Sequence, residues 1–243
     1  MKLISFAGQA ILIIAILAAL IFQLDLAQVK YKLWLVLSIV GVSGSVALIG
    51  CILLVRKYSA GENVPADLTG LLLLCMVPSF LFLFAVGPEG LMAPALYDIS
   101  TDTQNPPVLA YAEANRERHD NSAVYPKDLV SQQLRWYPEI KTLSVALPSR
   151  DAFHISIFTA SMLGWRILNW NSRTGQIDLR QSTRYFAFKS DIAIRITPVD
   201  ALNSNIDVRS GSLKGGRDFA FNARRIDSFF TGFNAELKKR QKH

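Results

Sequence analysis

The sequence predicts an α+β protein in which three N-terminal transmembrane helices precede a four-stranded antiparallel sheet that helices cover on one face. The first observation is that the early part of the chain gathers its apolar residues into long runs. The second is that later segments alternate apolar and polar residues, as strands do, between stretches with helical spacing. We therefore expect a membrane domain over residues 1–87, a polar, proline-rich linker over 88–125 and an α+β domain with a basic tail over 126–243.

The predicted membrane helices correspond to Ile4–Leu24, Leu33–Val55 and Leu68–Val86. Each run has about 20 residues with almost no charge, enough to cross a hydrocarbon core of ~30 Å. A cleaved signal peptide is the alternative for the first run. Its apolar stretch is too long for one, and no small-residue cleavage site follows it, so a retained helix is favoured.

The distribution of charge predicts the orientation in the membrane. A cytoplasmic N-terminus keeps three basic residues inside and leaves two outside, namely Lys2, Arg56 and Lys57 against Lys30 and Lys32. Residues 87–115 contain acidic residues but neither lysine nor arginine, as translocated segments often do. We expect a multi-pass protein of the inner (cytoplasmic) membrane, with its C-terminal domain in the periplasm.

Small residues in the second run predict a helix-packing face made of Gly41, Gly44, Ser45 and Gly50. Small side chains let helix backbones approach closely inside a membrane. No Asp, Glu, Lys, Arg or His lies in the middle of a run, which argues against a transporter or pump. Cys51 and Cys75 both fall within the runs and are interpreted as packing thiols. No metal-ligand spacing exists, so neither a metal nor another cofactor is expected.

Helical segments are expected at both ends of the α+β domain. A short helix is predicted near Pro126–Trp136, and a longer one is predicted to begin at a cap, Asp151, and to stop at Gly164. The last helix is predicted after Asp218, with Phe219, Ile226, Phe229, Phe230 and Phe233 along its apolar face.

The four strands are expected over residues 165–172, 174–188, 191–200 and 205–210. In the third of these, Ile192, Ile194 and Ile196 face one way and alternate with polar residues. We interpret the opposite face as solvent-exposed and as carrying a ladder of cross-strand salt bridges. Its predicted members are Arg184, Asp191, Arg195, Asp207 and Arg209.

Two further clusters of polar residues have alternative interpretations. The first, Asp98, Ser100, Thr101, Asp102 and Thr103, either binds calcium or forms side-chain caps; it lacks the spacing of a calcium loop, which favours caps. The second is a turn with Lys214, Gly215, Gly216, Arg217 and Arg224. It either contacts an anion or lipid head group, or simply turns the chain into a helix capped by Asp218; no phosphate-loop pattern is present.

Several motifs in order resemble a bacterial family, the domain of unknown function 1499. The matching pieces are "DISTDTQNPP", "GWRI", "STRYFAFKSDIAIRI" and "IDVRSGSLKGGRDFAFNARRI". The resemblance covers roughly Tyr97 to Phe233 and leaves the apolar runs outside. It implies no particular activity.

The sequence favours a non-enzymatic, membrane-anchored accessory or assembly subunit of a larger membrane complex, of respiratory or photosynthetic type. No catalytic set can be built from the three histidines, so no catalytic residue is assigned. From residue 96 onward, 21 Lys and Arg face 15 Asp and Glu, which favours membrane lipids or an acidic protein partner over nucleic acid.

Two alternatives remain open. One is a periplasmic domain that binds a lipid or small hydrophobic ligand among Phe186, Phe188, Phe219, Phe229 and Phe230. The other is a carboxylate-dependent hydrolase that uses Asp98 with Asp102, or Asp191 with Asp207.

Overall fold

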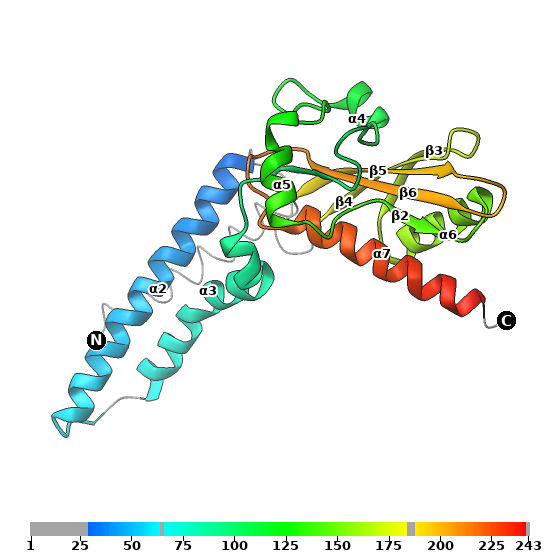
Figure 1. The fold of residues 1–243 in the computed structure, drawn as a ribbon. Coiled ribbons are helices and arrows are strands. Elements are labelled where there is room, and N and C mark those ends of the chain that lie inside the picture. The colour runs from blue at the N-terminus through cyan, green and yellow to red at the C-terminus, as the bar shows by residue number, and fades with distance from the viewer. Residues whose placement is uncertain (1–28, 64–65, 184–187, 242–243) are drawn as a thin grey trace. The chain divides into compact units, whose positions relative to one another are not determined.

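The structure, a computed structural model, describes residues 29–63, 66–183 and 188–241, which belong to two compact units (Figure 1). The first unit contains helix α2 (Val29–Ser59) and most of helix α3 (Ala66–Met92). The second unit begins at Glu89 and contains the sheet.

Small residues of α2 lie against α3. A side chain at Gly50 would clash with Leu72, and a Cβ atom at Gly44 would lie 3.7 Å from the Ser79 hydroxyl. Ser79 also shares a hydrogen bond of 2.9 Å with Ser43 of α2. Gly44 and Gly50 of the predicted packing face therefore lie against α3, and only Gly50 leaves no room for a side chain.

The two other members of that predicted face do not meet α3 in this way. A Cβ atom at Gly41 would have no neighbour within 4 Å. The Ser45 hydroxyl donates to the Gly41 carbonyl oxygen on its own helix, at 2.8 Å.

The prediction of three membrane-spanning helices is wrong for the part of the chain that the structure describes. There, one stretch, Ser38–Ser59 of α2, is long and apolar enough to cross a membrane or to serve as a signal sequence. In α3 the apolar stretch is shorter, Ser79–Met92, and it covers only the second half of the predicted span Leu68–Val86; Gly87, one residue past that span, leaves helical geometry (φ 69°, ψ 167°). The first predicted span lies outside the described residues.

The second unit contains both helices and strands. In chain order it contains β1 (Asp98–Ser100), α4 (Ala110–Asn115), η1 (Lys127–Leu129), α5 (Val130–Trp136), β2 (Leu143–Val145), α6 (Ser149–Met162), β3 (Arg166–Asn171), β4 (Gln176–Ser182), β5 (Lys189–Pro198), β6 (Ser204–Ser212) and α7 (Phe221–Arg240).

The sheet has six strands in the order β1-β6-β5-β4-β3, with β2 paired to the other end of β6. All described pairings are antiparallel. The prediction of four strands is therefore wrong: the meander β3–β6 has two additional strands along the outer edge of β6. β1 and β2 have three residues each, too few for alternation to be visible in the sequence.

Helices α6 and α7 cover one face of the sheet, as Figure 1 shows. The isoleucines of β5 point to this side, and Ile192, Ile194 and Ile196 are almost completely buried. Phe229 of α7 is fully buried there and stacks on Trp165 with ring centroids 5.7 Å apart. The predicted apolar alternation is confirmed.

The ends of the two covering helices differ in how well the sequence predicts them. Helix α6 begins at Ser149, so the predicted cap at Asp151 is wrong; the helix ends before Gly164, whose φ of 71° confirms the predicted stop. At α7 the Asp218 carboxylate accepts the backbone N–H groups of Ala220 and Asn222, at 3.1 and 2.7 Å, and so caps the helix as expected.

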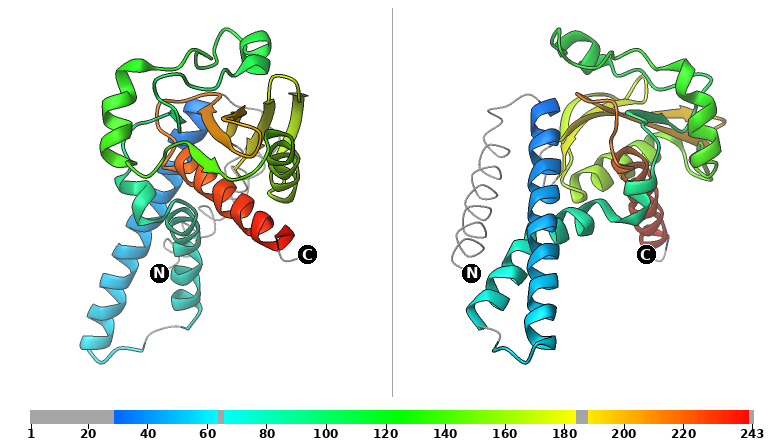
Figure 2. Two further views of the ribbon diagram at one scale, coloured as in Figure 1. Left: turned by 45° about the vertical axis from the view of Figure 1, so that its right-hand side comes forward. Right: turned by 90° about the vertical axis from the view of Figure 1, so that its left-hand side faces the viewer.

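The opposite face of the sheet is covered too, so the predicted solvent-exposed face is wrong. Residues 101–125, including α4, pass over this face, and we call them the covering segment (Figure 2). Leu109 and Ala112 pack there on Ala193 of β5 in a small apolar cluster. The segment expected as a linker thus contributes a strand and a covering layer, and it encloses charged side chains.

Candidate functional site

The covered face of the sheet carries charged side chains from neighbouring strands. The register pairs Asp191 of β5 with Arg180 of β4 and with Gly211 of β6. Gly211 is paired in turn with Asp98 of β1. Arg209 lies two residues before Gly211 on β6, and therefore on the same face. The strands thus place acidic and basic side chains side by side.

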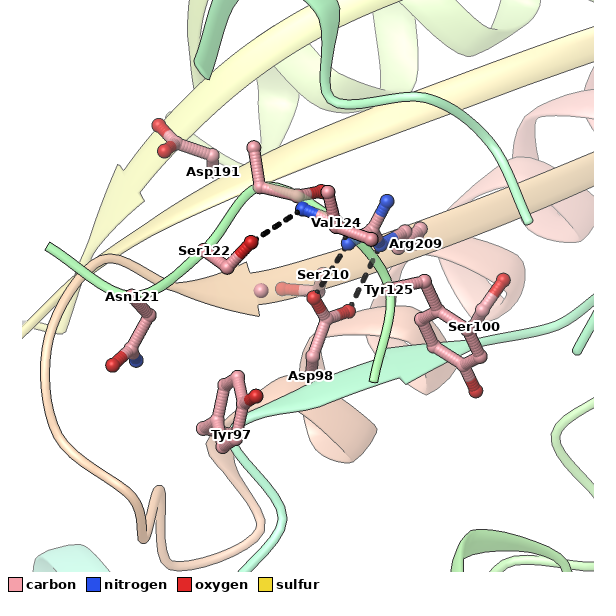
Figure 3. Close-up of polar contacts among 12 residues, drawn as sticks. Tyr97, Asp98, Ser100, Asn121, Ser122, Val124, Tyr125, Asp191, Arg209 and Ser210 are labelled. Carbon is pink, nitrogen blue, oxygen red and sulfur yellow. Dashed lines mark hydrogen bonds and ion pairs between the residues drawn. The ribbon is translucent and has the colours of Figure 1, made fainter. Parts of the chain in front are cut away.

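Among the ion pairs of the described residues, Asp98 and Arg209 form the most deeply buried one, shown in Figure 3. The guanidinium donates to both carboxylate oxygens, at 3.0 and 2.7 Å, and only 1% of Asp98 and 2% of Arg209 is exposed. The same guanidinium donates to the backbone oxygens of Pro107 and Ala123, at 3.2 and 2.8 Å. The ring of Tyr125 lies 5.2 Å from it. Arg209 therefore ties the sheet to the covering segment.

Gln133 of α5 connects this pair to the edge of the sheet. Its side-chain oxygen accepts hydrogen bonds from the Tyr125 hydroxyl at 2.9 Å and from the Ser100 backbone N–H at 3.1 Å. Its amide nitrogen donates to the Ser100 carbonyl oxygen at 2.7 Å. On the edge of β1 away from β6, the Gln133 side chain thus makes the backbone hydrogen bonds that a neighbouring strand would make.

Asp191 is held by two arginines. Arg116, from the covering segment, donates to one of its oxygens at 3.1 Å, and Arg180 lies 2.7 Å from the other. Arg116 also donates to the backbone oxygens of Asn121 and Ser122, both at 2.7 Å. Like Arg209, Arg116 joins the sheet to the layer above it.

Asp207 forms a third centre on the same face. Arg195 bridges Asp207 and Asp102, at 2.8 and 2.9 Å. The other Asp207 oxygen accepts the hydroxyl groups of Thr101 and Thr142, at 3.0 and 2.5 Å. Both Asp207 oxygens therefore have partners.

Burial sets the electrostatics of this face. It raises the pKa of Asp98, against the opposing effect of the Arg209 hydrogen bond, and it also raises the pKa of Asp178 of β4. A carboxylate that works as a base or nucleophile needs access to a substrate. Asp98, Asp191 and Asp207 instead bind arginines and hydroxyl groups, and Asp178 accepts a hydrogen bond from the Gln176 side-chain amide. This arrangement is suited to holding a layer in place.

A pocket lies elsewhere in the second unit, between α7, the end of α5 and residues 89–93; we call it the α5–α7 pocket. Its volume is about 400 Å³. Apolar and polar side chains share its wall, which is lined by Glu89, Met92, Ala93, Trp136, Tyr137, Glu139, Ile140, Ala220, Ala223, Arg224, Ile226, Asp227 and Phe230. Burial raises the pKa of Tyr137 to about 12, so this phenol stays protonated at neutral pH.

Comparison with known families assigns the second unit. The sequence profile of a family described as "Protein of unknown function (DUF1499)" matches residues 98–233, which is more than half of the chain. The chain belongs to this family. No curated protein matches the chain. The DUF1499 match begins at the first residue of β1 and ends within α7, so it contains both partners of the Asp98–Arg209 pair.

Within the DUF1499 region, the oxygen-rich cluster after Asp98 forms turns and caps. Asp102 accepts the backbone N–H groups of Gln104 and Asn105, at 3.0 and 2.8 Å. The Ser100 hydroxyl donates to the Asp102 carbonyl oxygen at 2.8 Å. Among the described residues, no group of acidic, histidine or cysteine side chains is suited to a metal ion. The contacts match the cap interpretation.

The predicted anion-contact residues have partners inside the protein. Lys214 lies 3.5 Å from Asp120, and Arg217 donates to the carbonyl oxygens of Leu91 and Ala93 at 2.6 and 3.0 Å. Arg224 donates to the Phe219 carbonyl oxygen at 2.7 Å. Gly215 has a φ of 87°, whereas a Cβ atom at Gly216 would meet nothing within 4 Å. Of the five residues, Arg224 alone lines the α5–α7 pocket. Anion contact at this turn stays a prediction.

Sequence reasoning missed parts of both sites. Asp178 and Arg180 occupy alternating polar positions of β4, so the sequence does contain a signal for them. Arg116 and Gln133 carry no such signal, because only the fold brings them to the sheet. The α5–α7 pocket combines segments far apart in the sequence. Two of its lining residues were expected near a ligand, namely Phe230 beside a hydrophobic molecule and Arg224 beside an anion or lipid head group.

Proposed function

We propose that this protein is a non-enzymatic, membrane-attached binding protein whose α+β unit takes the apolar part of a lipid, or of a similar small hydrophobic molecule, into the α5–α7 pocket. The observation that carries the proposal is the cavity of about 400 Å³, with Trp136, Ile226 and Phe230 in its wall. Pockets for small molecules typically have volumes of roughly 300–1,000 Å³ and mostly apolar walls.

The composition of the pocket favours an amphipathic ligand. Glu89, Glu139, Arg224 and Asp227 line it together with the apolar residues. A ligand with an apolar chain and a polar end satisfies both kinds of wall, since an apolar wall excludes water and a polar wall needs hydrogen bonds.

The sequence around the pocket favours a ligand drawn from a membrane. Glu89, Met92 and Ala93 lie at or just after the end of α3, whose stretch Ser79–Met92 is apolar. α2 contains the stretch that can cross a membrane. We further propose attachment to the inner membrane with the α+β unit in the periplasm. This is supported by the lack of Lys and Arg over residues 87–115.

Native mass spectrometry of the full-length protein, purified from its own membranes in a mild non-ionic detergent, tests this proposal. We expect a bound lipid-like mass. Trp136 is 48% exposed, so Trp136→Glu places a charge in the pocket wall without opening the core. This variant should lose the bound mass.

Leu134→Glu is the matched control, because Leu134 lies on the same helix, is 49% exposed and does not line the pocket. It should retain the ligand. Recovery of the wild-type protein without any ligand, or equal retention by both variants, would contradict the proposal.

An accessory or assembly role in a larger membrane complex is our second proposal. It is supported by the apolar surface that α2 leaves exposed, which suits either lipid or another membrane helix; the residues are Val42, Leu48, Ile49, Ile52, Leu53 and Val55. Stoichiometric co-purification with one membrane complex from native membranes would favour this role. Recovery of the protein alone would count against it.

A further inference from the structure

A second hollow lies between α6, the turn that joins β3 to β4, and the end of β5; we call it the α6–turn groove. Its volume is about 750 Å³. It shares no lining residue with the α5–α7 pocket, so a ligand bound here would be independent of the function proposed for that pocket.

The charged side chains of this groove all have one sign. They belong to Arg150 and Arg173; His154 also lines the groove, and none of the lining residues that the structure describes is a carboxylate. The side chains of Arg150, His154 and Arg173 make no hydrogen bond or ion pair to any residue that the structure describes. This differs from the covered face of the sheet, where arginines bind carboxylates of the chain itself. The groove therefore offers unpaired donors to an external anion.

An aromatic surface lies beside these donors. Trp170 of β3 lines the groove and is 56% exposed. The ring of Phe153 of α6 packs against the Trp170 ring edge to face, with ring centroids 6.2 Å apart and planes at 63°. Phe153 is itself 4% exposed, so its position is set by the core. An exposed indole held in this way can stack against a flat ring.

The turn that carries Arg173 is held in place. The Asn171 side chain accepts the backbone N–H groups of Arg173 and Thr174, at 3.0 and 3.3 Å. Gly175 has a φ of 69°, and a side chain there would clash with the carbonyl oxygen of Ile196. The Ile196 N–H donates to the Gly175 carbonyl oxygen at 2.9 Å. A preformed turn lowers the entropic cost of binding.

We propose that the α6–turn groove binds a small organic anion that carries a flat ring, with Arg150 and Arg173 contacting a phosphate or carboxylate and Trp170 stacking on the ring. Guanidinium groups match the planar, paired oxygens of these anions. The volume of the groove is within the range of small-molecule sites.

Isothermal titration calorimetry of the full-length protein in a non-ionic detergent tests this assignment. The probes are adenosine 5′-monophosphate and 1-naphthyl phosphate, each with a ring and an anion, compared with adenosine and inorganic phosphate, which have one feature each. The ring phosphates should bind at least about tenfold more tightly than the single-feature probes, and raising the salt concentration should weaken them.

Substitutions then locate the site. The double variant Arg150→Ala, Arg173→Ala should weaken both ring phosphates by about tenfold or more. Arg118→Ala, Lys127→Ala is the control, since it removes two exposed positive charges elsewhere in the same unit. Trp170→Ala should weaken the ring phosphates but not inorganic phosphate. Trp136→Glu, in the other pocket, should change nothing.

Any of three results would overturn the proposal. The first is no binding of either ring phosphate up to about 1 mM. The second is inorganic phosphate binding as tightly as the ring phosphates, which would leave the indole without a role. The third is unchanged binding by the double arginine variant, which would place the probe elsewhere.

Discussion

At the scale of single residues, the second unit depends on arginines that reach across layers. Arg209 pairs with Asp98 on the sheet and also donates to the backbone of the covering segment. Arg116 does the converse, from the covering segment to Asp191. Buried pairs of this kind contribute less net stability than their geometry suggests, because both ions lose their hydration. Because each carboxylate has a specific arginine partner, these pairs favour one position of the covering segment on the sheet.

Replacing Arg209 by Met should destabilise the folded protein by about 3–5 kcal/mol, because it leaves the Asp98 carboxylate buried without its partner. The double variant Asp98→Leu, Arg209→Met should lose less than this single variant. Chemical unfolding of the full-length protein in detergent measures both. Arg118→Met, at an exposed position, is the control and should change little.

A double variant as unstable as Arg209→Met alone would contradict this account. It would mean that the contacts of Arg209 to the covering segment, rather than an uncompensated charge, dominate its contribution to stability.

The pH dependence of stability should reveal Asp218. Burial raises the pKa of this carboxyl from 3.8 to about 6. The folded state then binds a proton that the unfolded state has released, so stability should rise as the pH falls from 7 to 5 and be lost again as the pH rises through 6. The expected gain is on the order of 1 kcal/mol.

Unfolding of the full-length protein at several pH values, monitored by tryptophan fluorescence, measures this effect. Asp218→Asn removes the titrating group and should flatten the profile between pH 5 and 7. An unchanged slope in this variant would assign the dependence to other buried carboxyls, such as Asp98 and Asp178, whose pKa values are raised as well.

At the scale of elements, the contacts explain why some segments were predicted and others were not. The sequences of β5 and α7 each place apolar residues along one side, so the spacing of apolar residues, every second residue for a strand and every three to four for a helix, is enough to identify them. β1 is stabilised by pairing with β6 on one edge and by the side chain of Gln133 on the other. Its conformation is therefore decided by partners more than 30 residues away in the sequence.

The α2–α3 pair allows a direct test of element packing. Gly50→Leu should separate the helices, because any side chain at this position meets Leu72. Gly41→Leu is the matched control on the same helix, since nothing lies within 4 Å of a Cβ atom there.

The hydroxyl oxygens of Ser43 and Ser79 are 2.9 Å apart, so a disulfide between Ser43→Cys and Ser79→Cys reports whether α2 and α3 are in contact. The background protein has Cys51 and Cys75 replaced by Ala. The crosslink should form readily in the Gly41→Leu protein and much less in the Gly50→Leu protein. Equal crosslinking in the two would show that α2 and α3 do not need the glycine to approach.

At the scale of the whole molecule, the chain divides at Pro88 and Glu89. The hydrophobic core of the second unit draws on its own strands and on α6 and α7, and it begins with Leu96 and Ile99. The DUF1499 match lies entirely within this unit. The second unit therefore has what a separate domain requires.

A truncated protein that starts at residue 89 should fold without the preceding residues, because its core does not use them. Circular dichroism and a cooperative unfolding transition close to that of the second unit in the full-length protein would confirm this. An aggregated or non-cooperative product would show that residues 1–88 are needed for the domain to fold.

The sequence by itself determined the α+β class of the second unit, its meander of four longer strands, the last helix and the family. Hydrophobic periodicity and the order of motifs are properties of the sequence itself, so they can be recognised without the fold. Only the tertiary structure decided that β1 and β2 join the sheet, and that residues 101–125 cover its charged face. These features arise from contacts between distant segments, so no local pattern encodes them. Asp191 and Arg209 look solvent-exposed in the sequence and are buried in the fold, where Arg116 binds Asp191 and the backbone of the covering segment accepts hydrogen bonds from Arg209.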